Sequence, residues 1–232
     1  MWILAGNFAG ILYPVLIQLK SDPRRQGEAA LNASIVLSYC VMPLALIQAA
    51  VAGPVLGSLF GQKWTTSVPV IQLLSVGLAL DAISWVAGSL MAARGEFVVG
   101  LRYFLVQLPI FFALVVAGAL LDQEVGVAWA VCAFYAVTQP VFVYAVYRRV
   151  GVGLRQVALI YIKPTLYAAI SVAQSLAVSG LLTFLVHPLA QVAFICLTSF
   201  ILYIALVRGF APDVWREMTK RVGSALRRNA IA

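Results

Sequence analysis

GSLFGQKWTTSVPVIQLLSVGLALDAISWVAGSLMAARGE, residues 57–96, is the stretch that decides the fold. A short polar turn with Lys63 and Trp64 leads into a mostly apolar run, Val68–Ala92, which ends in a second polar turn. A run of this length can cross the hydrocarbon core of a bilayer as one α-helix. Asp81 lies near its centre, and an ionisable residue at that depth is a candidate functional residue by default.

The whole chain has the composition of a helical membrane protein. Of its 232 residues, 63% are hydrophobic and 10% are charged, against roughly 45–50% and 25% in soluble domains. Mean hydropathy is +0.99. The apolar runs are nearly continuous rather than alternating, which favours membrane helices over the strands of a barrel.

We predict an all-α polytopic membrane protein. Residues 1–209 form the membrane domain, and residues 210–232 form a basic amphipathic tail in the cytoplasm. Seven predicted spans make up the membrane domain: Met1–Leu19, Ala30–Ala52, Val68–Ala92, Leu101–Leu121, Val125–Tyr147, Pro164–Val186 and Leu189–Val207. Pro164 is expected in the first turn of its helix, where the missing N–H costs little.

The net charge of +8 indicates membrane topology rather than nucleic-acid binding, because the charges are confined to short connectors. Of the 16 Lys and Arg residues, 15 fall in alternate connections and in the tail. Basic residues mark the cytoplasmic side, so we predict that the amino terminus lies outside and the carboxyl terminus lies in the cytoplasm. Aromatic residues are expected in the interfacial belts: Trp2, Trp64 and Trp129 outside, and Tyr103, Tyr147 and Tyr161 inside.

Two segments are predicted to lie on the membrane surface rather than in it. Leu154–Lys163 places apolar residues on one face and Arg155 and Lys163 near the headgroups. The tail from Pro212 begins with acids and ends with bases, which suits the helix dipole. Its apolar stripe comprises Val214, Met218, Val222, Ala225 and Leu226.

Metal and nucleophile chemistry find no support in the sequence. The three cysteines, Cys40, Cys132 and Cys196, fall inside apolar runs and are read as small core residues. His187 is the sole histidine, and it precedes Pro188 in a predicted outer turn. The usual catalytic constellations cannot be assembled from these residues, so we expect no metal, no cofactor and no enzymatic activity.

Three successive stretches are similar to a known family. They read LYPVLIQLKSDPRR at 12–25, YCVMPLALIQAAVAGPVLGSLFGQKW at 39–64 and PVIQLLSVGLALDAISWVAGSLMAARGE at 69–96. A loop, a mid-span proline, an FGxxW turn and a further span follow one another in this order. This arrangement resembles that of the polysaccharide flippases of the multidrug/oligosaccharidyl-lipid/polysaccharide exporter superfamily. The resemblance covers about residues 10–96; the later spans agree only in hydropathy and spacing.

The resemblance implies a transporter that moves lipid-linked oligosaccharide repeat units across the inner membrane by alternating access. It implies two six-helix lobes around a central cavity, often with two extra carboxyl-terminal helices. The seven spans would form most of the second lobe plus the extra pair. A first span with its amino end outside has no preceding cytoplasmic charge, so we expect either the carboxyl-terminal part of a larger transporter or a wrongly assigned start. The expected partners are membrane lipids, the oligosaccharide substrate and an amino-terminal lobe.

Asp81 is the candidate for ion coupling in such a transporter. Together with Gly77, Ser84 and Gly88 it forms a narrow stripe of polar and small residues at helical spacing. The stripe either lines a cavity or lets another helix pack closely, and a neutral, hydrogen-bonded structural Asp81 remains an alternative. The candidate cavity-lining residues are Asn7, Ser84, Gln107, Gln139 and Gln174, and the candidate headgroup contacts are Arg102, Arg155 and Lys163.

Three other functions stay open at this point. A drug exporter of the same superfamily would carry an acid-rich cavity without cations in its other lobe. A membrane ligase or acyltransferase of polysaccharide assembly would need outer arginines and histidines, whereas the predicted outer loops offer only Lys63 and His187. A seven-span receptor would share the topology, but the loops here are very short.

Overall fold

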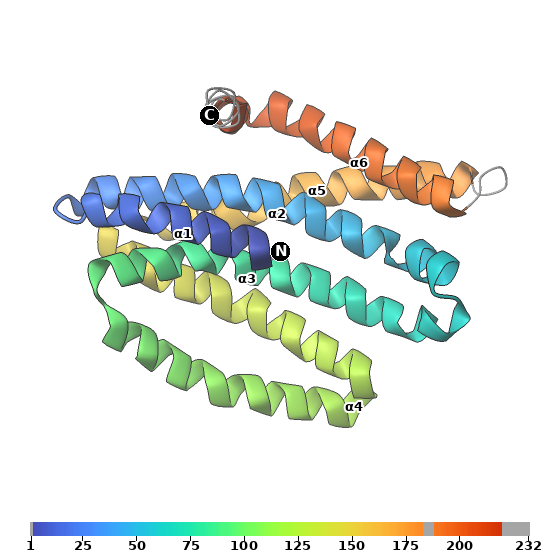
Figure 1. The fold of residues 1–232 in the computed structure, drawn as a ribbon, viewed down its shortest axis with the longest axis horizontal. Coiled ribbons are helices and arrows are strands. Elements are labelled where there is room, and N and C mark those ends of the chain that lie inside the picture. Colours follow the sequence, from blue (N-terminus) through green and yellow to red (C-terminus); the bar gives the residue numbers. More distant parts are fainter. Residues whose placement is uncertain (1, 183–187, 220–232) are drawn as a thin grey trace, which may run out of the picture.

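The computed structural model describes residues 2–182 and 188–219, and this part of the chain contains helices and turns only. The elements are α1 (Trp2–Gln18), α2 (Pro23–Leu59), η1 (Gln62–Ser67), α3 (Val68–Arg94), α4 (Phe97–Tyr147), η2 (Arg148–Val150), α5 (Leu154–Leu182) and α6 (Pro188–Phe210). Figure 1 shows the long helices running roughly along one axis of an elongated bundle. The all-α prediction is confirmed.

Helix α4 is a hairpin of two arms rather than one rod. Asp122 and Gln123 have non-helical backbone angles, and Gln123 adopts a φ of 44°. Figure 1 shows the two arms folding back beside each other. Gly118 and Gly126 face one another across this bend, and a Cβ on either would overlap the backbone carbonyl of the other. Two neighbouring passes were predicted here, and the glycines explain how they approach so closely.

Five helices of the described chain are long and apolar enough to cross a membrane: α2, the η1–α3 unit, α4 with η2, α5 and α6. Helix α1 has 17 residues, and α4 contributes two arms. The described chain is therefore built as a multi-pass helical membrane protein. The connections 19–22, 95–96 and 148–153, which lie in or next to the basic clusters of the sequence, gather at one end of the bundle (Figure 1). This end is called the basic end below.

Helix α2 begins earlier and ends later than the predicted span Ala30–Ala52. Its N-cap is Asp22, whose carboxylate accepts a hydrogen bond of 3.1 Å from the Arg25 N–H, and Pro23 occupies the first turn. Capping of this kind stabilises a helix start even in polar sequence. The prediction missed residues 23–29, which include charged side chains that lower the hydropathy, and also missed residues 53–59 beyond its end.

The prediction that Leu154–Lys163 forms a separate surface segment is wrong. These residues are the first part of α5, which continues through Pro164 to Leu182. Val157, Ile160 and Tyr161 are buried in the main core, and this packing holds the segment in line with the rest of the helix. Pro164 accordingly lies inside the helix and not in its first turn.

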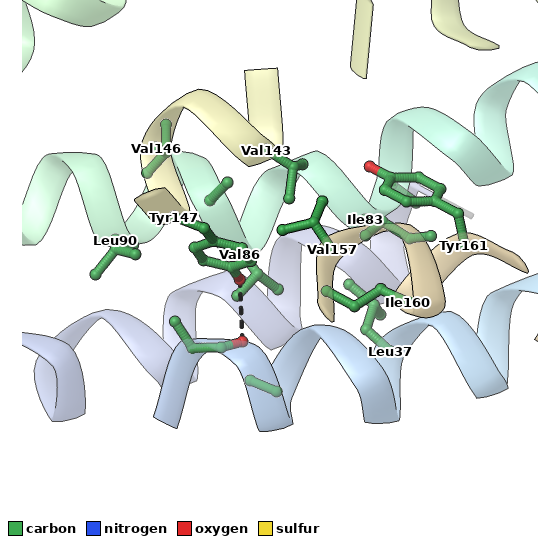
Figure 2. Packing of buried hydrophobic residues seen from close by; sticks show 14 of the residues in the cluster. Leu37, Ile83, Val86, Leu90, Val143, Val146, Tyr147, Val157, Ile160 and Tyr161 are labelled. Carbon is green, nitrogen blue, oxygen red and sulfur yellow. Dashed lines mark hydrogen bonds between the residues drawn. The ribbon is translucent and has the colours of Figure 1, made fainter. Parts of the chain in front are cut away.

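Tyr147 also departs from its predicted place in an interfacial belt. It is fully buried, its hydroxyl and the Ser34 hydroxyl lie 2.6 Å apart in a hydrogen bond, and it also donates to the Ala30 carbonyl at 3.0 Å. Figure 2 shows its ring among the side chains of α2, α3 and α5. A buried tyrosine needs such partners for its hydroxyl, and sequence alone does not reveal them.

Helix α2 divides the molecule into two packed regions. The larger core cluster joins α1, α2, α3, the second arm of α4 and the start of α5. The smaller cluster joins α2 to α5 and α6 and comprises Tyr39, Ala168, Tyr203, Val207 and Ala211. Val214 and Met218 of the predicted amphipathic tail pack against the smaller cluster. His187 and the remaining stripe residues Val222, Ala225 and Leu226 lie outside the described residues.

Candidate functional site

Asp81 lies in the middle of α3 and is half-buried. The Trp85 indole, one helical turn further on, donates a hydrogen bond of 3.3 Å from Nε1 to Asp81 Oδ2. Tyr135 from the second arm of α4 and Tyr161 from α5 both lie within electrostatic range of the Asp81 carboxylate. The hydrogen bond from Trp85 thus holds one carboxylate oxygen of Asp81 from within its own helix.

The stripe of polar and small residues on α3 has two kinds of surroundings. Gly77 packs against the second arm of α4, where an added Cβ would lie 3.1 Å from the Cys132 Cα. Ser84 and Gly88 line an open pocket of about 530 Å³ between α1, α3 and the second arm of α4, beside Trp85. Gly77 therefore packs closely against another helix, whereas Ser84 and Gly88 border an open pocket.

The five candidate cavity-lining residues have different surroundings. Ser84 lines the pocket beside Trp85, but its hydroxyl donates to the Asp81 main-chain carbonyl at 2.7 Å and so is satisfied within its own helix. Gln139 is buried on the second arm of α4 and Gln107 is half-buried on the first. Asn7 on α1 and Gln174 on α5 are exposed. Their role as cavity lining stays a prediction.

The three candidate headgroup contacts are all exposed, as that role requires. Arg102 lies near the start of α4, and Arg155 lies at the start of α5. Lys163, further along α5, lines a pocket of about 310 Å³ that Gln156 and Asp213 also line. Contact with lipid headgroups remains a prediction for each of them.

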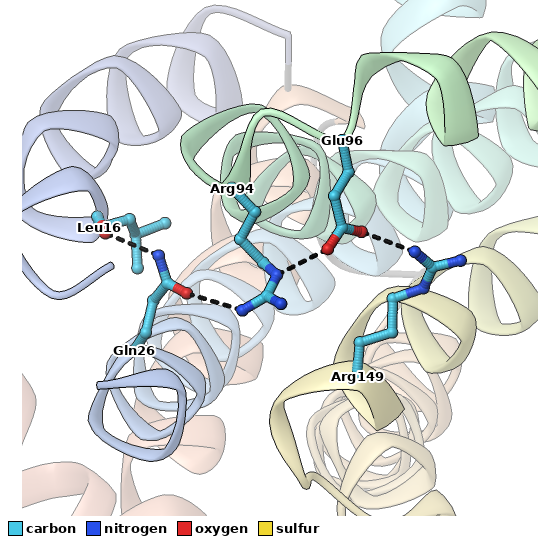
Figure 3. Close-up of polar contacts among 5 residues, drawn as sticks. All are labelled: Leu16, Gln26, Arg94, Glu96 and Arg149. Atoms are coloured by element: carbon cyan, nitrogen blue, oxygen red, sulfur yellow. Dashed lines mark hydrogen bonds and ion pairs between the residues drawn. The ribbon is translucent and has the colours of Figure 1, made fainter. Parts of the chain in front are cut away.

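A network of polar side chains ties four segments together at the basic end (Figure 3). Glu96 follows α3 and accepts from Arg94 Nε at 2.8 Å on one oxygen and from Arg149 Nη1 at 2.7 Å on the other. Arg94 Nη1 also donates to Gln26 Oε1 at 3.3 Å, and Gln26 Nε2 donates to the Leu16 carbonyl at 2.7 Å. The chain of contacts runs from α1 through α2 and α3 to η2, and it is called the Glu96 network below.

Glu96 is the ionic centre of this network. Partial burial by itself raises the pKa of Glu96, but hydrogen bonds from Arg94 and Arg149 and their positive charges outweigh burial and lower the pKa below its ordinary value. Its side chain is 21% exposed, so the two ion pairs are only partly screened by water. Glu96 is therefore held ionised at neutral pH, which fits a structural role.

Sequence reasoning did not identify several of these groups. Trp85 could have been found, because a residue four positions after Asp81 on a helix lies on the same face. The Arg94–Glu96 pair closes the stretch quoted first, yet its link to Arg149 depends on how α4 returns to the basic end. Tyr135 and Tyr161 reach Asp81 only through tertiary packing, and no local pattern points to them.

Comparison with known proteins places the first part of the chain beside proteins of polysaccharide biosynthesis. Residues 1–69 match the model of a family described as polysaccharide biosynthesis protein. The chain is also similar to an uncharacterized membrane protein in the cps region of Klebsiella pneumoniae, with 27% identity over 118 residues, which are 51% of this chain and 24% of that protein. The chain thus spans about a quarter of the length of the relative it matches. No solved structure matches the chain.

Proposed function

We propose that the chain forms part of a membrane transporter that moves lipid-linked oligosaccharide repeat units across the bacterial inner membrane. The match of residues 1–69 to a polysaccharide biosynthesis family is the observation that carries this proposal. The FGxxW turn, with Lys63 and Trp64, lies inside that matched part. The described chain also has five helices long and apolar enough to cross a membrane, as a protein that moves a substrate across the bilayer requires.

The proposed transport requires the protein to shield the substrate from hydrocarbon, and it forms no covalent bond. A polar sugar and a diphosphate must be kept from hydrocarbon while the lipid tail stays in the bilayer, and alternating access between two lobes achieves this. On this proposal, the described helices belong to one lobe and the rest of the protein supplies the other. The amino terminus lies outside, the basic end faces the cytoplasm and meets anionic lipid, and the protein acts as a transporter and not as an enzyme.

The positions of the basic residues suggest which lobe binds the diphosphate and which lobe couples transport to an ion gradient. Within the basic end, Arg94 and Arg149 are already committed to Glu96. No Lys or Arg lies in the interior of a predicted span, and Arg102 and Lys163 are exposed at the edges of their predicted spans. We therefore assign the main diphosphate-binding cations to the other lobe, and we assign to α3 the coupling of transport to an ion gradient through Asp81.

Replacing Asp81 tests this assignment. In the full transporter, Asp81→Asn should abolish most polysaccharide export at unchanged protein level, because the amide keeps the shape of the side chain but cannot exchange a proton. Export would be measured as surface polysaccharide across pH 6–8. Glu28→Gln is the matched control, since Glu28 is an exposed acid on α2 paired only at the surface with Arg24, and it should export normally. Normal export by Asp81→Asn over this pH range would end the coupling proposal.

A further inference from the structure

An apolar groove of about 600 Å³ lies between α2, α6 and the short helical segment 212–219, which is called the crossing segment below. Figure 1 shows the chain turning away from the axis of α6 where this segment begins. Val214, Trp215 and Met218 of the crossing segment pack against the smaller core cluster. The crossing segment is therefore fixed beside α2 and α6, and it supplies one wall of the groove.

The lining of the groove is almost entirely apolar. Its walls include Leu44 of α2, Ile204 of α6 and Met218 of the crossing segment. The hydroxyl of Tyr203, which also lines the groove, already donates to the Tyr39 carbonyl at 2.9 Å. Leu44 is 42% exposed, so the groove is open to the surroundings of the bundle. The volume is in the usual range of ligand sites, and a hydrocarbon chain, which needs no hydrogen-bond partner, fits such walls.

Exposed arginines follow groove-lining residues on two of the walls. Arg208 comes directly after Val207 on α6, and Arg216 comes directly after Trp215 on the crossing segment. Arg208 also lies one helical turn after Ile204, which places it near the same face of α6. Trp215 is half-buried, and tryptophan is enriched where a protein meets the membrane–water interface. The groove thus combines an apolar interior with positive charge at its edge.

We propose that this groove binds one acyl chain of an anionic phospholipid such as phosphatidylglycerol, whose phosphate contacts Arg208 and Arg216. Arginine binds phosphate through strong charge-assisted hydrogen bonds, and the acyl chain buries apolar surface of α2, α6 and the crossing segment at once. The lipid therefore joins these three parts of the chain. The site does not depend on the proposed transport function, because a lipid can occupy it whether or not the protein moves oligosaccharides.

Native mass spectrometry of the purified full chain tests the site. The protein is released from micelles that contain equal amounts of phosphatidylglycerol and phosphatidylethanolamine, and the lipid that stays bound is identified. The wild type should retain phosphatidylglycerol at a single site.

Ile204→Trp places a larger side chain in the groove. Each buried CH₂ group strengthens lipid binding about fourfold, so displacing even two of them should lower the bound fraction about tenfold. Ile201→Trp is the matched control, because Ile201 also lies on α6 but is 58% exposed and does not line the groove. It should bind lipid as the wild type does. Leu44→Trp blocks the groove from the α2 side and should repeat the loss, which covers the case that Ile204→Trp does not fold.

Replacing both Arg208 and Arg216 by glutamine tests the headgroup contact. Each basic residue beside an anionic lipid surface strengthens binding about fivefold, so the ratio of bound phosphatidylglycerol to phosphatidylethanolamine should fall roughly twentyfold. Arg155→Gln is the control, because Arg155 is exposed at the start of α5 and does not line the groove; the ratio should not change. An unchanged ratio in the double variant would overturn the proposal, as would unchanged binding in both groove-filling variants. Retention of a co-purified polyprenyl phosphate in place of the phospholipid would overturn it too.

Discussion

The carboxylates of Glu96 and Asp81 belong to the same stretch of sequence, yet they lie in opposite chemical surroundings. Glu96 is held by two guanidinium groups from Arg94 and Arg149 at the basic end. Asp81 accepts a hydrogen bond from the neutral Trp85 indole on its own helix. Cations fix a carboxylate in its charged form, whereas neutral donors allow it to gain and lose a proton. The comparison supports a structural role for Glu96, whereas ion coupling at Asp81 stays a proposal.

The largest effect on stability is expected from Glu96→Gln. The change removes the charge that separates Arg94 from Arg149 and leaves two guanidinium groups facing a neutral amide. We expect the free energy of unfolding to fall by about 2 kcal/mol, the usual range for hydrogen bonds to charged groups. Denaturation of the purified chain in mixed micelles, followed by circular dichroism, measures this change.

Glu28→Gln provides the matched control for that measurement. Glu28 pairs with Arg24 one helical turn away at 3.4 Å, and both side chains are mostly exposed. Surface pairs of this spacing contribute about 0.3–0.5 kcal/mol, so the variant should unfold almost as the wild type does. Equal losses of unfolding free energy in the two variants would mean that Glu96 contributes no more to stability than a surface ion pair does.

The stabilising effect of Glu96 should disappear in acid. Because the pKa of Glu96 is lowered in the folded state, its contribution is fully present above the ordinary glutamate pKa of about 4.3. It is lost as pH falls through the lower folded pKa, since the unfolded chain takes up the proton first. The difference in unfolding free energy between the wild type and Glu96→Gln should therefore be constant from pH 7 to pH 5.5 and shrink below about pH 4. A difference that grows in acid would contradict the assigned direction.

The fold could be predicted from sequence wherever one local property decides it. Apolar length located α3 and α6 closely. The failures have specific physical causes. Asp22 capping and polar residues extend α2 beyond its apolar middle, and burial of Val157 and Tyr161 keeps the start of α5 in line with its span. Both depend on contacts rather than on hydropathy.

The candidate site was predictable only at its centre. Asp81 stands out because a carboxylate is rare in an apolar run, and Ser84 and Gly88 follow from helical spacing. The electrostatic influence between Asp81 and Tyr135 of α4 or Tyr161 of α5 depends on how those helices return to α3. The same holds for Arg149, which reaches Glu96 only because the α4 hairpin closes at the bend where Gly118 meets Gly126.

Of the two carboxylates compared, Asp81 is expected to show the smaller stability change, in Asp81→Asn. The amide keeps an oxygen that can accept from the Trp85 indole, and its NH₂ group can find acceptors that the acid does not need. We expect the free energy of unfolding at pH 7 to change by less than about 1 kcal/mol in either direction. The same micelle denaturation used for Glu96→Gln measures it. A loss as large as that of Glu96→Gln would show that Asp81 is held in its charged form by structural contacts, and the two carboxylates would then share one role. A small change combined with a large loss of export would separate their roles, because only a group that is dispensable for folding can exchange its proton repeatedly without weakening the bundle.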